Sequence, residues 1–236
     1  MAVVRPSRAA SPLAPGSKRV GRLTRAERTY ALPAPGRRER NKQDKLRRIK
    51  QAARKLFYEL GYEATTTQAI ADAADIGSGT LFSYVRVKED LLLMVFLDDL
   101  LAVIDKSLKS ISARAKLVDR VFHLFDSLLR FHARDAQLSR HFARETYAVR
   151  SPERRADINR LMSAIQDPLT QMVTAEQARG RIRADADPQL TAWQFFAFYY
   201  GVVSGLVNDM TTLAEGRALL RKSLDGLVRG LQPQVP

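Results

Sequence analysis

Apolar side chains recur every three or four residues along most of the chain after residue 40, which is the spacing that places them on one face of an α-helix. The first such helix is predicted at 41–60, where Ile49, Ala53 and Phe57 share a face and Gly61 ends the segment. The later long helices are predicted at 88–111, 116–134, 137–149, 152–180, 188–209 and 213–231. Because no stretch shows the alternation of a strand, the predicted fold class is all-α.

The stretch after Gly61 predicts two short helices joined by a tight turn. Thr66 is the expected N-cap of the first, because a threonine hydroxyl accepts a hydrogen bond from the free N–H groups of a first turn. Asp75 and Gly77 then mark the turn, and the second helix follows from about Ser78 to Tyr84. The inward residues are Ile70, Ala71, Ala74, Leu81 and Val85, and the outward residues are Ser78, Thr80, Ser83 and Tyr84. This pattern is typical of a helix-turn-helix, which places its second helix in the major groove of DNA.

Residues 44–91 resemble the N-terminal DNA-binding domain of the tetracycline-repressor (TetR) family. The resemblance rests on several linked motifs: Gly61-Tyr62, the threonine-rich cap at 65–67, Ile70-Ala71, Gly79-Thr80-Leu81, Tyr84 and Lys88-Glu89. The chain departs from the family pattern at Asp75, Gly77, Phe82, Val85 and Val87. The family favours glycine at Asp75, and it favours a capping serine or asparagine at Val87. Val87 therefore leaves the next helix without a capping side chain.

The resemblance implies a role in DNA binding for particular residues and a common architecture for the rest. The residues that would face base edges are Ser78, Gly79, Thr80, Phe82 and Ser83. The residues that would hold backbone phosphates, and so fix register without reading sequence, are Thr66, Thr67, Tyr84 and Lys88. The resemblance also implies a homodimer, formed mainly through the last two long helices, and an effector pocket among the middle helices.

The net charge of +14 is concentrated at the start of the chain, because residues 1–40 hold 10 basic and 2 acidic residues, a net of +8. We predict a disordered basic tail at 1–40, a helix-turn-helix DNA-binding domain at 41–101 and a helical regulatory and dimerisation domain at 102–236. The tail is either inert or an arm that adds contacts to DNA phosphates. The absence of cysteine excludes disulfides and favours a reducing, cytoplasmic location.

Aromatic residues supply the candidate ligand pocket. Six of the eight positions from Trp193 to Tyr200 are aromatic, so some of these rings must face a cavity or a second subunit. The candidate pocket residues are Phe131, Phe142, Tyr147, Trp193, Phe196 and Tyr200. Arg140, Arg144 and Glu145 either meet an anionic ligand or form ion pairs at the surface. The apolar run 195–207 is shorter than the roughly 20 residues that span a bilayer, so no membrane partner is predicted.

Other kinds of chemistry find little support in the sequence. His123, His132 and His141 are spaced nine apart, two and a half helical turns, so they do not share a helix face, and neither a metal site nor a cofactor is predicted. The chain lacks the Gly-x-Ser-x-Gly, Walker and His-Glu-x-x-His motifs, which argues against an enzyme. The sequence therefore predicts a homodimeric transcriptional repressor that a small molecule releases from a palindromic DNA operator. The alternative is a ligand-independent architectural DNA-binding protein driven by the basic tail.

Overall fold

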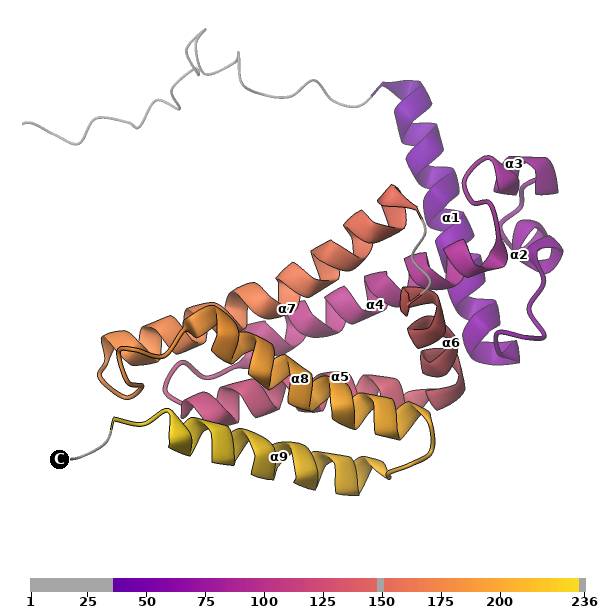
Figure 1. Cartoon of the computed structure of the whole chain (residues 1–236). Helices are drawn as coiled ribbons and strands as arrows, with labels where there is room; N and C mark the ends of the chain where they lie inside the picture. The colour runs from indigo at the N-terminus through magenta and orange to yellow at the C-terminus, as the bar shows by residue number, and fades with distance from the viewer. Residues whose placement is uncertain (1–35, 148–150, 234–236) are drawn as a thin grey trace, which may run out of the picture. The chain divides into compact units, whose positions relative to one another are not determined.

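Helices form all the regular structure in the part of the chain that the computed structural model describes, residues 36–147 and 151–233 (Figure 1). The chain divides into two units, 1–40 and 41–236. The helices are α1 Arg37–Leu60, α2 Thr67–Ala73, α3 Ser78–Phe82, α4 Lys88–Ser110, α5 Leu117–Arg134, α6 Ala136–Tyr147, α7 Pro152–Ala178, α8 Pro188–Val207 and α9 Leu213–Gly230. The all-α prediction is confirmed.

The predicted tail needs one change at its boundary. The first helix begins at Arg37, four residues before the predicted start at Asn41, so residues 37–40 belong to α1. The disorder predicted for residues 1–35 lies outside the described residues. The end predicted for the sixth helix, Val149, also lies outside them, since α6 is described as far as Tyr147.

Local hydrogen bonds start the helices at the residues that the sequence indicates. The hydroxyl of Thr66 accepts from the backbone N–H of Ala69 at 3.1 Å and caps α2. Ser151 caps α7 in the same way, and the carboxylate of Asp187 accepts from two N–H groups at the start of α8. These side chains satisfy donors that a helix leaves free in its first turn.

Residues in the left-handed backbone region end α1 and turn the chain between α2 and α3. Gly61 has φ +82° and carries no Cβ to resist that angle. Asp75 adopts φ +53° in the turn, which explains why the family pattern favours glycine there. The turn nevertheless forms with aspartate, a residue that tolerates this region better than most.

The two short helices α2 and α3 share one core with α1 and with the start of α4. Phe57, Ile70 and Leu81 are fully buried, and Val85 is nearly so. Two ion pairs on the side of this core join α1 to α4, Lys50 to Asp98 and Arg54 to Asp99, each at 2.8 Å. The helix-turn-helix is therefore fastened to α4 by packing and by charge.

Helices α4 to α9 form a bundle around a second part of the same core (Figure 1). Helix α8 packs against α5, α7 and α9, while α7 also packs along α4. The carboxylate of Glu176 on α7 is buried and pairs with Arg120 on α5 at 2.7 Å, with Arg179 and Arg181 on its outer side. A buried carboxylate needs such partners, because removing a charge from water is costly.

Helix α8 is longer than the apolar run within it. The helix has 20 residues and is long and apolar enough to cross a membrane by length and composition. The apolar run 195–207 did not predict this, because it has only 13 residues. Its packing gives a different explanation for the apolar composition. Phe195 and Tyr199 are buried in the bundle, whereas Trp193, Phe198 and Tyr200 are exposed. One side of the helix therefore packs into the core, and another side exposes apolar rings to solvent.

Candidate functional site

Helix α3 presents a small exposed surface above its buried anchor. Leu81 is fully buried and Val85, just after the helix, is 3% exposed, and these two anchor the segment in the core. On the opposite side Gly79 and Ser83 are exposed, and Phe82 is 51% exposed. An exposed aromatic ring beside small residues is typical of a helix face that contacts a binding partner, because a ring that packs in a core is buried.

Hydrogen bonds within the motif orient the polar side chains on this surface. The hydroxyl of Ser78 donates to the side-chain oxygen of Gln68 at 2.5 Å, which joins α3 to α2. The hydroxyl of Ser83 donates to the carbonyl of Thr80 at 2.7 Å, so the Ser83 oxygen can only accept a further hydrogen bond. Tyr84 is half-buried against the core. Phe82 and Ser83 are thus the most exposed side chains of this surface.

The start of α2 provides a second exposed group of polar atoms. Thr66 is exposed and Thr67, the first residue of the helix, is half-buried. The first N–H groups of a helix carry partial positive charge and attract phosphate. The Thr66 hydroxyl already accepts the N–H of Ala69, so it retains its proton for an outside acceptor such as a phosphate oxygen.

Lys88 takes a role that the sequence did not indicate. Its ammonium donates to the backbone carbonyls of Tyr62 and Thr65, at 2.9 and 3.1 Å, and lies 4.2 Å from the centre of the Tyr62 ring. It therefore ties the start of α4 to the loop between α1 and α2. The phosphate contact predicted for Lys88 stays a prediction, but two of its three donors are occupied.

The start of α4 is capped from within the helix. Val87, the N-cap residue, has no acceptor in its side chain, and the carboxylate of Asp90 accepts instead from the backbone N–H groups of Arg86 and Val87, at 2.8 and 3.2 Å. Burial opposes ionisation of Asp90, yet hydrogen bonds from the backbone of Arg86 and the side chain of Arg154 outweigh it and hold the pKa below its usual value. Asp90 thus supplies the half of a capping box that accepts from the N-cap N–H, while the half that an N-cap side chain supplies is missing at Val87.

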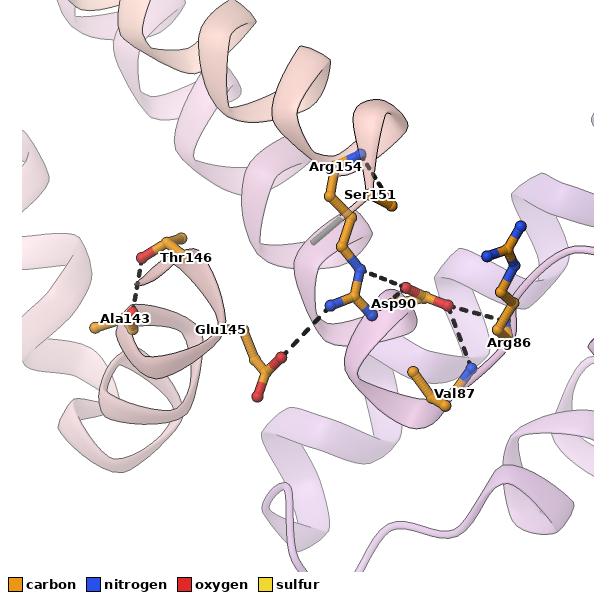
Figure 2. Close-up of polar contacts among 8 residues, drawn as sticks. All are labelled: Arg86, Val87, Asp90, Ala143, Glu145, Thr146, Ser151 and Arg154. Atoms are coloured by element: carbon orange, nitrogen blue, oxygen red, sulfur yellow. Dashed lines mark hydrogen bonds and ion pairs between the residues drawn. The ribbon is translucent and has the colours of Figure 1, made fainter. Parts of the chain in front are cut away.

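The same carboxylate joins α4 to the first turn of α7. Figure 2 shows the guanidinium of Arg154 between the carboxylates of Asp90 and Glu145. Arg154 Nε donates to Asp90 Oδ1 at 2.7 Å, and Arg154 Nη1 lies 3.6 Å from Glu145 Oε2 on α6. One arginine therefore connects α6 and α7 to the residue that caps α4, six residues after Tyr84.

A cavity of about 470 Å³ lies among α4, α5, α6, α7 and α8. Its walls are mostly apolar and include Leu128, Leu161, Ile165 and Val203. Of the candidate pocket residues, those that line it are Phe142, Trp193, Phe196 and Tyr200. Phe131 does not line it and packs edge-on against Phe96, with ring centroids 5.0 Å apart. Tyr147 ends α6, and its side chain lies outside the described part of the chain.

A buried polar chain runs along one wall of this cavity. His132 lies 3.2 Å from the hydroxyl of Ser139 through Nδ1 and 3.1 Å from the hydroxyl of Tyr199 through Nε2. Burial lowers the pKa of His132 to about 4, so the imidazole is neutral at neutral pH. No sequence pattern indicates this group, because the three residues come from three different helices.

Two arginines of α6 lie at the cavity and differ in their surroundings. Arg140 donates to the carbonyl of Val207 at 2.6 Å and pairs with Asp209 at 2.5 Å, so it is held at the end of α8. Arg144 lines the cavity and is exposed, and no hydrogen bond or ion pair joins it to any described residue. No aspartate or glutamate of the described residues lines the cavity. The charge at this wall is therefore positive.

Helix α6 also contacts the loop that Lys88 holds. The ring of His141 lies 4.5 Å from the ring of Tyr62, and its Nε2 is 3.4 Å from a carboxylate oxygen of Glu63. Arg144 lies one turn further along the same helix. A cavity-lining helix thus touches the connection between α1 and α2 directly.

Two short helices joined by a tight turn, the second with an exposed face above a buried anchor, have the arrangement of a helix-turn-helix DNA-binding motif. Residues 49–95 match the model of the bacterial regulatory proteins of the tetR family. The family match at these residues, with the relatives below, supports a TetR-family transcriptional regulator.

Individual relatives agree with this assignment. The uncharacterized HTH-type transcriptional regulator YhgD of Bacillus subtilis is 24% identical over 68% of this chain and 83% of its own length. The HTH-type transcriptional regulator UidR of Escherichia coli is 24% identical over 77% of this chain and 91% of its own. Among solved structures, FadR of Thermus thermophilus, a TetR-family repressor in complex with lauroyl-CoA, superposes with a TM-score of 0.62. It is 25% identical, over 80% of this chain and 96% of that one.

Proposed function

We propose that this protein is a homodimeric repressor that binds a palindromic DNA operator and is released from it by a small-molecule effector. The observation that carries the proposal is the exposed face of α3, with Phe82 open to solvent and Leu81 anchored beneath it. The apolar cavity in the same unit supports control by a ligand. The protein acts on DNA in the cytoplasm and is a regulator rather than an enzyme.

We assign the DNA contacts by the position of each side chain. The residues assigned to base edges in the major groove are Ser78, Gly79, Thr80, Phe82 and Ser83. The residues assigned to phosphates are Thr66, Thr67 and Tyr84, with Lys88 contributing through the one donor that its carbonyl contacts leave free. Phosphate contacts fix the register of the protein on DNA, and base contacts supply the specificity.

The proposed dimer forms through the outward faces of α8 and α9. These faces carry Leu190, Phe198 and Leu219, which are exposed, together with the small residues Gly201 and Gly226. A Cβ added at Gly201 or Gly226 would meet no atom within 4 Å, so both positions are open for another helix to approach. Two copies of this face would bury the exposed rings against each other around a twofold axis.

The proposed effector is an amphipathic anion with a long apolar body. The cavity lining follows α8 from Trp193 to Asn208, about 22 Å of helix at roughly 1.5 Å per residue. Arg144 supplies a cation without a described partner, and no described carboxylate lines the wall. The lauroyl-CoA complex of the T. thermophilus FadR, which shares this fold, supports an acyl chain as the apolar part.

Footprinting on DNA upstream of the protein's own gene and of neighbouring genes tests the proposal. Protection of one short palindrome, relieved by an acyl-chain effector, is the expected result. Uniform coating of DNA that weakens steeply with salt would instead favour an architectural binder driven by charge. A single protected site that no effector relieves would support the DNA-binding part and reject the ligand response.

A further inference from the structure

His132, Ser139 and Tyr199 form a buried chain of hydrogen-bonding groups in the cavity wall. All three residues line the cavity, and each is less than a tenth exposed. His132 lies in the last turn of α5, where carbonyl oxygens have no partner within the helix. Ser139 Oγ is 3.2 Å from the carbonyl oxygen of His132, and a carbonyl only accepts, so the serine donates there.

The direction of the remaining bonds follows from that first donation. Ser139 has a single proton, so its oxygen must accept from His132 Nδ1, 3.2 Å away, and Nδ1 carries the ring proton. The imidazole is neutral because burial lowers its pKa to about 4, so Nε2 is bare. Tyr199 therefore donates its proton to Nε2 across 3.1 Å. The chain runs from the tyrosine hydroxyl through the imidazole to the serine and then to the carbonyl.

This direction decides what the wall offers to a ligand. The proton of Tyr199 is committed to His132, so its oxygen has lone pairs and no free donor. No described residue donates to that oxygen. The Tyr199 ring stacks on Phe125 with ring centroids 4.7 Å apart and 6° between the planes, which fixes the position of the hydroxyl oxygen beside His132. The lining also contains the polar side chains Arg140, Arg144, Thr146, Ser204 and Asn208, but these are less buried than Tyr199, which offers a ligand group an acceptor in the buried part of the wall.

We infer that the effector carries a hydrogen-bond donor, a hydroxyl or an amide N–H, partway along its apolar body, and that Tyr199 accepts from it. The inference rests on the proposed effector cavity and adds a second recognition element to the anionic end. A carbonyl at the same place on the ligand would face an acceptor and would lose its hydrogen bond to water without replacement. Tyr199 is thus a specificity-determining residue that separates hydroxylated ligands from their oxidised counterparts.

The test compares saturated long-chain carboxylates with a hydroxyl or an oxo group at successive positions along the chain. For at least one position, we expect the hydroxy probe to bind the full-length protein about tenfold more tightly than the matching oxo probe, in line with the roughly 1–3 kcal/mol cost of an unsatisfied buried group. In Tyr199→Phe this preference should fall to near unity, while the ring still stacks on Phe125. Ser139→Ala should weaken the preference, and Ser139→Thr, which keeps the hydroxyl, should retain it.

The outcomes separate this inference from the proposed function. Equal binding of hydroxy and oxo probes at every position, or a preference for the oxo probe, overturns the inference and leaves the effector class standing. If no carboxylate binds, the proposed effector class fails, and the direction of the polar chain, on which the inference depends, is tested separately by the tautomer of His132. Nitrogen NMR of the imidazole should show a protonated Nδ1 and a bare Nε2. The opposite tautomer would overturn the direction of the chain.

Discussion

Arg154 and Asp90, 64 residues apart, meet where α7 begins and α4 is capped. Arg154 Nε donates to Asp90 Oδ1 at 2.7 Å, while Asp90 Oδ2 accepts from the backbone N–H groups of Arg86 and Val87. A shift of α7 therefore acts on the carboxylate that holds the start of α4. Because α4 begins just after the helix-turn-helix, this pair is a direct link between the cavity helices and the DNA-binding surface.

The first prediction separates the two functions of Asp90. Arg154→Met removes the link to α7 and leaves the α4 cap, so it should cost about 1 kcal/mol of unfolding free energy and reduce the effect of an effector on operator affinity. Asp90→Asn also weakens the cap and should cost more, about 2 kcal/mol. The measurements are urea unfolding and operator binding with and without effector. Arg160→Met is the control, because Arg160 pairs with the exposed Asp157 on the same helix. An effector response equal to wild type in Arg154→Met would contradict the link between α7 and α4.

The second prediction concerns Lys88. Lys88→Met should lower the unfolding free energy by about 1–2 kcal/mol, because two loop carbonyls lose a charged donor and Tyr62 loses its cation. The slope of operator affinity against salt should also fall by about one unit, because the remaining donor of Lys88 is assigned to a phosphate. An unchanged slope would remove Lys88 from the phosphate contacts. Lys55→Met, on the exposed side of α1, is the matched control for the loss of a charge.

The third prediction distinguishes base reading from phosphate binding. Ser83→Ala removes an exposed acceptor on α3 and should change which base is preferred at one operator position, with a discrimination of about 1–3 kcal/mol at stake. Thr66→Ala should weaken binding to all sequences alike and should cost about 1 kcal/mol of stability, because Thr66 caps α2. Selection from random DNA sites measures the first effect. An unchanged preference in Ser83→Ala would remove Ser83 from the base contacts.

The fourth prediction tests the dimer face. Gly201→Leu should leave the monomer folded, since a Cβ there meets no atom within 4 Å, but it should prevent close approach of a second α8. Overpacking costs roughly 1–3 kcal/mol, so the dimer dissociation constant should rise about tenfold or more, with a parallel loss of operator affinity. Sedimentation at several protein concentrations gives the constant. Ala102→Leu, at an exposed position of α4, should leave it unchanged, and a normal dimer in Gly201→Leu would move the interface elsewhere.

The fifth prediction concerns pH and His132. Its pKa is lowered from 6.5 to about 4 in the folded protein, so below pH 6.5 the unfolded chain takes up the proton first. The stability that the neutral imidazole contributes is therefore complete above pH 6.5 and declines as the pH falls toward 4. The loss should reach about 3 kcal/mol, at roughly 1.4 kcal/mol per pH unit. Urea unfolding across this range should show the loss in the wild type and in the surface variant His123→Gln, but not in His132→Gln.

Much of the local structure follows from residues within one turn of each other. Thr66, Ser151 and Asp187 cap α2, α7 and α8 because a hydroxyl or carboxylate at that position reaches the first free N–H groups whatever the rest of the protein does. The burial of Leu81 and Val85 follows equally from helical spacing. The sequence therefore determined the helices, the turn at Asp75 and the exposed face of α3.

The tertiary structure alone decided which long-range partner each side chain meets. Phe142 lines the cavity while Phe131 packs into the core, although both are aromatic residues of amphipathic helices. Arg140 is bound to the end of α8, and Arg144, one turn later, remains open to the cavity. Lys88 is directed inward, onto the loop carbonyls. Helical periodicity specifies a face, but the partner on that face depends on the angle and offset at which another helix packs, and these are set by the whole core.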